Sequence, residues 1–206
     1  MGLSLTGMNI ADIVNWQVST EELVHKFESD SLNLGSQLVV YPSQTAYFVK
    51  GGVIADEFTS GTYTIKSENI PILGKLINLA FNSESPFKAE VWFVNQVAIL
   101  DCKWGTATNI NIEDPKYKII VPVRAFGQYG FTISNPRVFL ESFVGSMASF
   151  STERLKEYFK GIIVSKLTGI ISSKLLQDDV SVVNISSYID ELSLYSEQAL
   201  NEFFLK

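Results

Sequence analysis

The side chains that most often do proton-transfer and nucleophilic chemistry are scarce in this sequence. Histidine does most acid–base work near neutral pH, and the chain holds a single histidine, His25. His25 stands between Leu23 and Phe27 at alternate positions of a predicted strand, which favours a structural histidine over a catalytic one. A Ser-His-Asp or Cys-His arrangement is conceivable only around this residue, so we assign no catalytic residue.

The single cysteine, Cys102, lies between Asp101 and Lys103 in a predicted strand. A reactive thiol needs an exposed electropositive setting, so a packed small residue is the preferred interpretation. One cysteine and one histidine cannot supply a zinc site of the usual kinds. A lone cysteine also cannot form an internal disulfide, which fits a reducing cytoplasm.

Motifs for nucleotide or acyl chemistry are absent from the sequence. There is no G-x-S-x-G, G-x-x-x-x-G-K-[ST] or G-x-G-x-x-G pattern, so we expect no cofactor and no small-molecule substrate. The 22 acidic residues can always be combined into carboxylate pairs, and none is assigned a role. An enzyme with an unrecognised carboxylate or lysine site stays an alternative, and it predicts a deep pocket with titratable groups of shifted pKa.

Composition excludes several classes of protein. The 206 residues are 46% hydrophobic and 18% charged, which is too apolar for a disordered chain and long enough for one domain with a real core. The net charge of −6 argues against a general nucleic-acid binder and against direct binding to anionic lipid. The N-terminus lacks the features of a signal peptide, although Gly2 and Thr6 fit the short myristoylation pattern. The longest apolar runs fall far short of a membrane span.

The first part of the chain, about residues 14–133, is predicted to form a mostly antiparallel sheet. Its short runs are rich in β-branched and aromatic residues and are separated by turn residues. Gly51 and Gly52, between runs 44–50 and 53–58, predict a hairpin with a primed turn. A short inserted helix is predicted over 70–81. Further candidate strands are 37–41, 61–65, 88–94, 97–103, 117–121 and 123–133, the last with Gly127 and Gly130 as candidate bulges.

The second part, about residues 136–204, is predicted to be helical, with its long helices packed on the sheet, so the fold class is α+β. A short helix is expected over 136–143, a long one over 151–176 with Ser151 as its N-cap, and another over 186–204. We treat 1–206 as a single domain. We also expect the native polypeptide to continue past Lys206 into a final strand and a C-terminal region.

The two long helices carry opposite charge. Residues 151–176 hold five basic and two acidic residues, for +3, whereas 184–204 hold four acidic residues and no base, for −4. Such faces are usually solvated surfaces of helices packed on a sheet. The alternative is an assembly surface, because complementary fields can pair helices of neighbouring copies. The candidate interface residues are Lys156, Lys160, Glu191 and Glu197.

Several runs in order resemble the stomatin/prohibitin/flotillin-type (SPFH, or PHB) domain, and most of all its soluble bacterial branch labelled virion core protein-like. The most specific are SPFKAEVWFVN at 85–95 and RAFG at 124–127. In that branch an Asp-Pro commonly opens the short helix, where this chain has Asn135-Pro136, and Asn can serve as the same cap. The other matching runs are 44–49, 51–52, 54–56, 61–64, 69–73, 103–106 and 127–129.

The resemblance implies a non-enzymatic scaffold. Proteins of this type assemble into oligomers at membranes and organise partner proteins there, most of them through an apolar N-terminal segment that this sequence lacks. By resemblance we expect a cytoplasmic homo-oligomer, held at the inner face of a membrane by an integral partner protein in a bacterial membrane-stress or membrane-organisation setting. A soluble structural or particle-core protein without a membrane role is the alternative.

Overall fold

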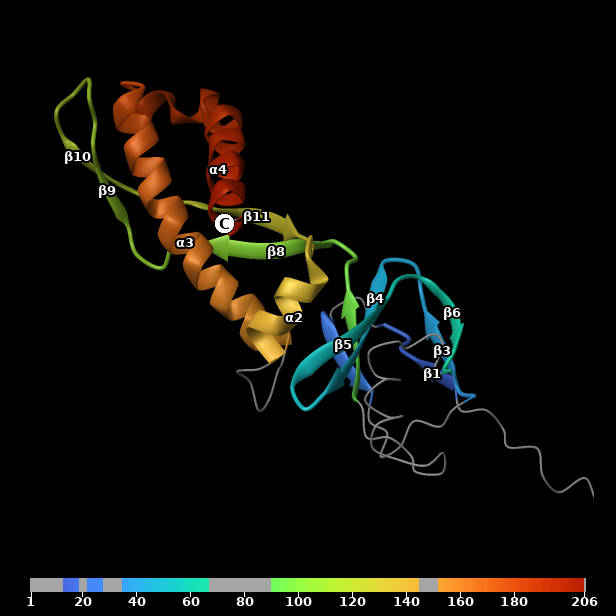
Figure 1. Cartoon of the computed structure of the whole chain (residues 1–206). Helices are drawn as coiled ribbons and strands as arrows, with labels where there is room; N and C mark the ends of the chain where they lie inside the picture. Colours follow the sequence, from blue (N-terminus) through green and yellow to red (C-terminus); the bar gives the residue numbers. More distant parts are fainter. Residues whose placement is uncertain (1–12, 19–21, 28–34, 67–89, 145–151, 206) are drawn as a thin grey trace, which may run out of the picture. The chain divides into compact units, whose positions relative to one another are not determined.

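The fold is α+β, with sheets built from the first part of the chain followed by long helices (Figure 1). The computed structural model describes residues 13–18, 22–27, 35–66, 90–144 and 152–205. The chain divides into two compact units. Unit 1 comprises Met1–Ile99 and Phe131–Thr152, and unit 2 comprises Leu100–Gly130 and Glu153–Lys206. The expectation of a single domain stays a prediction.

Unit 1 contains two sheets. The four-stranded sheet is antiparallel, in the order β2 (Val24–Phe27), β7 (Glu90–Asn95), β4 (Gln44–Lys50) and β5 (Val53–Phe58). The three-stranded sheet has the order β1 (Ile13–Asn15), β3 (Gln37–Val40) and β6 (Gly61–Thr64). In it β1 runs parallel to β3, and β6 runs antiparallel to β3.

The hairpin predicted at the glycine pair is confirmed. Lys50 of β4 pairs with Val53 of β5 across a two-residue turn. Gly51 and Gly52 have φ angles of 59° and 79°, in a region of backbone conformation that residues with a Cβ rarely adopt. The turn therefore depends on glycine at both positions, as a primed turn does.

Both sheets of unit 1 contribute to one apolar core. Leu38 of β3 and Phe48 and Phe93 of the four-stranded sheet are fully buried in it. The rings of Phe48 and Phe58 meet edge to face with centroids 5.0 Å apart. Six of the seven residues of β4 are buried because this strand lies between β7 and β5 and is covered on both faces.

Helix α2 (Pro136–Val144) opens as the sequence predicts. The side-chain oxygen of Asn135 accepts a hydrogen bond of 3.1 Å from the backbone N–H of Val138, so Asn135 is the expected N-cap. Arg137 and Glu141, one turn apart on the helix, form an ion pair of 3.0 Å. The pKa of the buried Tyr47 hydroxyl in β4 is raised mainly by burial, while the charge of Arg137 lowers it and that of Glu141 raises it.

Unit 2 combines two strand pairs with two long helices. The strands are β8 (Ile99–Gly105) with β11 (Phe126–Phe131), and β9 (Ile110–Glu113) antiparallel to β10 (Ile120–Val123). The helices are α3 (Thr152–Gln177) and α4 (Ile189–Phe204), joined through the 3₁₀ segment η1 (Val182–Ser187). Ile110 and Ile112 of β9 are buried in one cluster with residues of α3, so the helices pack on strands as predicted.

Several boundaries differ from the predictions. The strand over 110–113 was missed, and the strand predicted over 117–121 begins at Ile120 because the preceding residues form a turn. The last helix begins at Ile189, after the 3₁₀ segment, and not at 186. The helix predicted over 70–81 and the N-cap predicted at Ser151 lie outside the described residues.

Gly127 serves close packing between β8 and β11. A Cβ at this position would lie 2.9 Å from Nε1 of Trp104, closer than carbon and nitrogen atoms pack. The indole of Trp104 in β8 therefore occupies the space that any larger residue at 127 would need. Close approach is thus one role of Gly127, and the bulge expected at this position stays a prediction.

Candidate interaction surface

The helices α3 and α4 hold each other through a shared apolar seam. Ile163, Leu167, Ile171 and Leu175 of α3 are buried, at intervals of four residues. Leu192 and Leu200 of α4 pack against the same cluster. Hydrophobic spacing that could have served another copy of the chain is thus used inside this chain.

Two lysines of α3 lie over aromatic rings of α4. Nζ of Lys166 is 4.3 Å from the centroid of Phe203, and Nζ of Lys174 is 4.9 Å from the centroid of Tyr195. The second lysine comes eight residues after the first along α3, whereas its ring partner comes eight residues before the first ring along α4. The helices are therefore antiparallel, and cation–π contacts reinforce their register.

Lys174 also joins acidic residues on both sides of the α3–α4 connection. Its Nζ lies 2.6 Å from Asp178 and 3.8 Å from Glu191. The pKa of Lys174 is raised, first by the hydrogen bond to Asp178 and then by the nearby negative charges, against the opposing effect of burial. At this point the opposite charges of the two helices are paired within one chain.

The four predicted interface residues occupy different settings. Glu191 is engaged, because it accepts a hydrogen bond of 3.1 Å from the Tyr188 hydroxyl and lies near Lys174. Lys156 is half-buried, and its charge acts to lower the pKa of the Cys102 thiol, against the larger effect of burial. Lys160 and Glu197 are exposed, and no ion pair joins either to another described residue. The structure does not bring the four together in one chain, and their role as an interface stays a prediction.

Aromatic side chains gather where the C-terminal end of α4 meets α3. Phe159 of α3 and Phe204 of α4 meet edge to face at 5.7 Å, and Phe204 contacts Phe203 at 5.1 Å. Tyr158, beside Phe159, is 59% exposed. The cluster leaves an apolar edge on the helix pair that solvent reaches.

The Asp114 carboxylate accepts four hydrogen bonds in unit 2, and no pattern in the sequence pointed to it. One carboxylate oxygen accepts the backbone N–H groups of Lys116 and Tyr117, both at 2.9 Å. The other accepts the Ser181 hydroxyl and the Val182 N–H, both at 2.8 Å. Burial alone would raise the pKa of Asp114, but these hydrogen bonds outweigh it and hold the pKa below its usual range. Asp114 thus fastens the β9–β10 turn to the start of η1.

His25 and Cys102 each have a packing partner. The His25 ring stacks on Trp16 with centroids 5.4 Å apart and planes inclined by 10°. The Cys102 thiol is hydrogen-bonded to Tyr129, and burial raises the pKa of both groups, to about 12 for Tyr129. A thiol whose pKa is raised holds little thiolate at neutral pH, so this setting does not activate Cys102.

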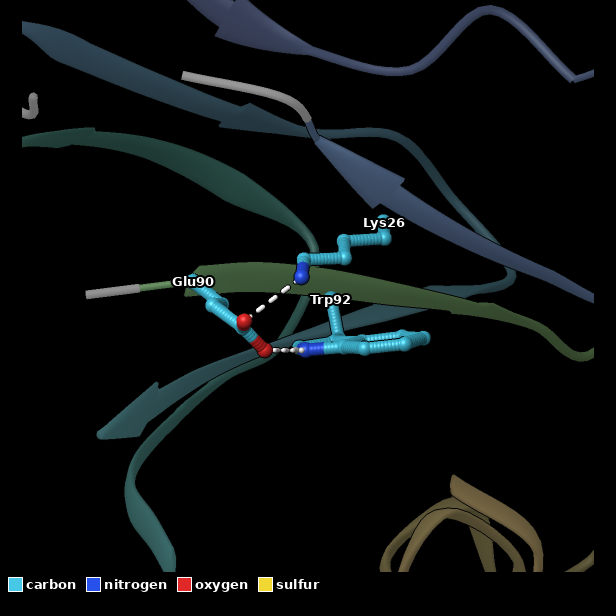
Figure 2. Close-up of polar contacts among 3 residues, drawn as sticks. All are labelled: Lys26, Glu90 and Trp92. Atoms are coloured by element: carbon cyan, nitrogen blue, oxygen red, sulfur yellow. Dashed lines mark hydrogen bonds and ion pairs between the residues drawn. The ribbon is translucent and has the colours of Figure 1, made fainter. Parts of the chain in front are cut away.

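A polar cluster joins β2 and β7 in unit 1. Glu90 receives Lys26 on one carboxylate oxygen at 2.5 Å and the indole N–H of Trp92 on the other at 2.9 Å (Figure 2). The hydrogen bond from Lys26 is the main reason that the pKa of Glu90 is lowered. A carboxylate with both oxygens engaged and a lowered pKa is a poor general base. The cluster is therefore a cross-strand contact on the surface of the sheet, which stabilises the pairing of β2 with β7.

An open depression of about 430 Å³ lies in unit 2. None of the six side chains with displaced pKa values lines it; these are Tyr47, Glu90, Cys102, Asp114, Tyr129 and Lys174. Nowhere among the residues that the structure describes are three His, Cys, Asp or Glu side chains grouped as a metal site would need. The residues that line the depression are Lys116, Asp179, Val180, Ser181, Asn184, Ser187 and Tyr188.

Comparison with sequence models of protein families shows which family the chain belongs to. The sequence model of the SPFH domain-Band 7 family matches residues 24–206, from the first residue of β2 to the end of the sequence. The chain belongs to the SPFH domain-Band 7 family. The resemblance found in the sequence is therefore confirmed, and the SPFH match includes all of unit 2 and unit 1 from residue 24 onward.

A curated relative of this SPFH chain is the uncharacterized protein YdjI of Bacillus subtilis (strain 168). The two are 27% identical over 180 residues, which cover 86% of this chain and 54% of YdjI. The chain thus spans about half the length of the curated relative it matches. No solved structure matches this SPFH chain. The helices of the described part are each too short or too polar to span a membrane.

Proposed function

We propose that this SPFH chain is a non-enzymatic scaffold that assembles into homo-oligomers and is held at the cytoplasmic face of a membrane by an integral partner protein. The observation that carries the proposal is the family match over residues 24–206, because scaffolding at membranes is the role typical of SPFH proteins. The helix pair of unit 2 supplies the candidate surface for assembly.

The charges left over by the α3–α4 contact support the assembly half of the proposal. Lys174 and Glu191 neutralise each other within the chain, whereas Lys160 on α3 and Glu197 on α4 are exposed and have no ion pair in the described part. A contact that joins α3 of one copy to α4 of the next would pair them. Such a head-to-tail contact repeats from copy to copy and builds a ring or a filament.

Light scattering behind size exclusion, over a wide concentration range and at low and high salt, tests the assembly. We expect oligomers that weaken with salt. The variants Lys160→Glu and Glu197→Lys should each weaken assembly, and the double variant should restore it because the pair is re-formed with reversed signs. Lys103→Glu, an exposed lysine of β8, is the matched control. A monomer at every concentration would contradict assembly by this chain.

Fractionation of native cells tests the membrane half of the proposal. We expect the protein in the membrane fraction, and we expect salt or alkaline washing to release it, because a partner protein and not a lipid-spanning segment holds it there. A protein that stays soluble and forms large particles would contradict the proposal and would favour a particle-core role.

A further inference from the structure

The tip of the β9–β10 hairpin groups several exposed apolar side chains on one turn. We call residues 115–120 the hairpin tip. Tyr117 is 52% exposed, Ile119 57% and Ile120 72%, and they follow each other closely along the chain. Lys116 and Lys118 alternate with them and are exposed as well. Exposed apolar side chains that are grouped at one place, and not scattered singly, mark an interaction site.

Charge gives the hairpin tip a second distinguishing property. The stretch 115–124 contains Lys116, Lys118 and Arg124 and no acidic residue, in a chain with a net charge of −6. Acidic residues do lie nearby, since Glu113 pairs with Ile120 across the hairpin and Asp179 lines the same depression as Lys116. The exposed part of the tip itself, however, presents only positive charge and apolar surface.

The hairpin tip is held in one shape from within. The Asp114 carboxylate receives the N–H groups of Lys116 and Tyr117, the Asp114 N–H donates to Ile119, and the Lys118 N–H donates to the Asp114 carbonyl. Lys118 takes a φ of 54°, which these bonds maintain. The exposed side chains are therefore presented on a fixed turn, and little backbone entropy is lost when they bind something.

Basic, tyrosyl and aliphatic side chains together fit the headgroup region of an anionic bilayer. Tyrosine rings favour the boundary between lipid and water, and lysines stay near the phosphates while their stems cover apolar surface. Nζ of Lys116 lies 5.3 Å from the Tyr117 ring, which already places a cation beside the ring that would reach the interface. A groove on a protein would also suit the isoleucines, but it would need acidic residues of its own at the right places, whereas an anionic bilayer presents negative charge over its whole surface.

We propose that the hairpin tip docks on an anionic lipid bilayer, with Tyr117, Ile119 and Ile120 in the headgroup region and Lys116 and Lys118 against the lipid phosphates. The net charge of the whole chain opposes such binding, and the local charge of the tip is what overcomes it at short range. This contact goes beyond recruitment by a partner protein and would add a second, weaker attachment to it.

Flotation of the full chain with vesicles tests the inference. Vesicles of phosphatidylglycerol and phosphatidylcholine should carry the chain upward, and vesicles of phosphatidylcholine alone should carry much less. Lys116→Gln and Lys118→Gln should each weaken binding roughly fivefold. The double variant Ile119→Thr/Ile120→Thr should weaken it roughly tenfold or more. Val53→Thr, which changes another exposed strand residue next to a hairpin turn, should bind like the wild type.

A second readout keeps the test independent of folding. Tryptophan placed by Tyr117→Trp should be quenched by brominated lipid, whereas tryptophan placed by Phe126→Trp, at a position 86% exposed but outside the tip, should not. Equal flotation of the wild type and the isoleucine variant would overturn the inference, as would a wild type that never floats with anionic vesicles. Loss of a protein partner from the tip variants without vesicle binding would also overturn it, and would leave the scaffold proposal standing.

Discussion

Nζ of Lys166 on α3 lies 4.3 Å from the centroid of the Phe203 ring on α4. The same type of contact recurs eight residues away on each helix, between Lys174 and Tyr195. Eight residues are a little over two helical turns, so both contacts lie along one seam of the helix pair. A shift of α4 by one turn would break both contacts together.

A double-mutant cycle should detect the Lys166–Phe203 contact. Lys166→Met keeps the side-chain length and removes the charge, and Phe203→Leu keeps an apolar group and removes the ring. We expect a coupling free energy of about 0.5–1 kcal/mol, the usual size of a cation–π contact that solvent reaches. Urea unfolding of the two single variants and the double variant gives the value. Strictly additive effects would contradict the contact.

Asp114 should make unfolding sensitive to acid. Because the folded pKa of Asp114 lies below its unfolded value of about 3.9, its contribution to stability is present above that pH and is lost as pH falls through the folded pKa. Asp114→Asn should lower the urea midpoint near pH 6, and its difference from the wild type should shrink below about pH 4. Asp101→Asn, at an exposed position of β8, is the control. A difference that does not change with pH would count against the charged network.

Gly127 should tolerate no side chain. Gly127→Ala places a Cβ 2.9 Å from the Trp104 indole nitrogen, and the forced shift of the ring should cost about 1–3 kcal/mol of unfolding free energy. Gly105→Ala in the neighbouring strand meets its nearest atom at 3.5 Å and should change stability by less than about 0.5 kcal/mol. Denaturation of both variants, with near-ultraviolet circular dichroism of the tryptophans, makes the comparison. Equal stabilities would refute the packing argument.

The glycines of α3 should behave in the opposite way. Gly161 and Gly169 have open space where a Cβ would stand, so Gly161→Ala and Gly169→Ala should each stabilise the chain by up to about 1 kcal/mol through helix propensity. Gly51→Ala, where φ is 59°, should destabilise it by about 1 kcal/mol. Thermal unfolding of the three variants checks the signs. A loss of stability at Gly169 would show that something approaches this face of α3.

Local chemistry predicted the elements whose signals are strong and short in range. Two adjacent glycines indicated the β4–β5 turn, Asn135 indicated the start of α2, and the apolar spacing indicated α3 almost to the residue. The strand β9 was missed because four residues alternating between apolar and polar are too few to stand out from a loop.

Contacts between residues far apart along the chain could not be predicted from the sequence, for a different reason. The bonds of Asp114 come partly from Ser181 and Val182, which are far away along the chain, and no local pattern announces such a carboxylate. Apolar periodicity on α3 likewise looks the same whether its partner is α4 or another copy. The charges of the two helices predicted complementarity, and only the structure places Lys174 next to Glu191.

The interleaved order of the two units has a consequence for synthesis on the ribosome. After Met1–Ile99 of unit 1, the ribosome makes the strands of unit 2, then Phe131–Thr152 of unit 1, and only afterwards α3 and α4. Until then Ile110 and Ile112 lack the helices that bury them in the finished protein. Unit 2 therefore cannot complete its folding before α4 is translated, and until then its strands expose apolar residues that a chaperone can bind.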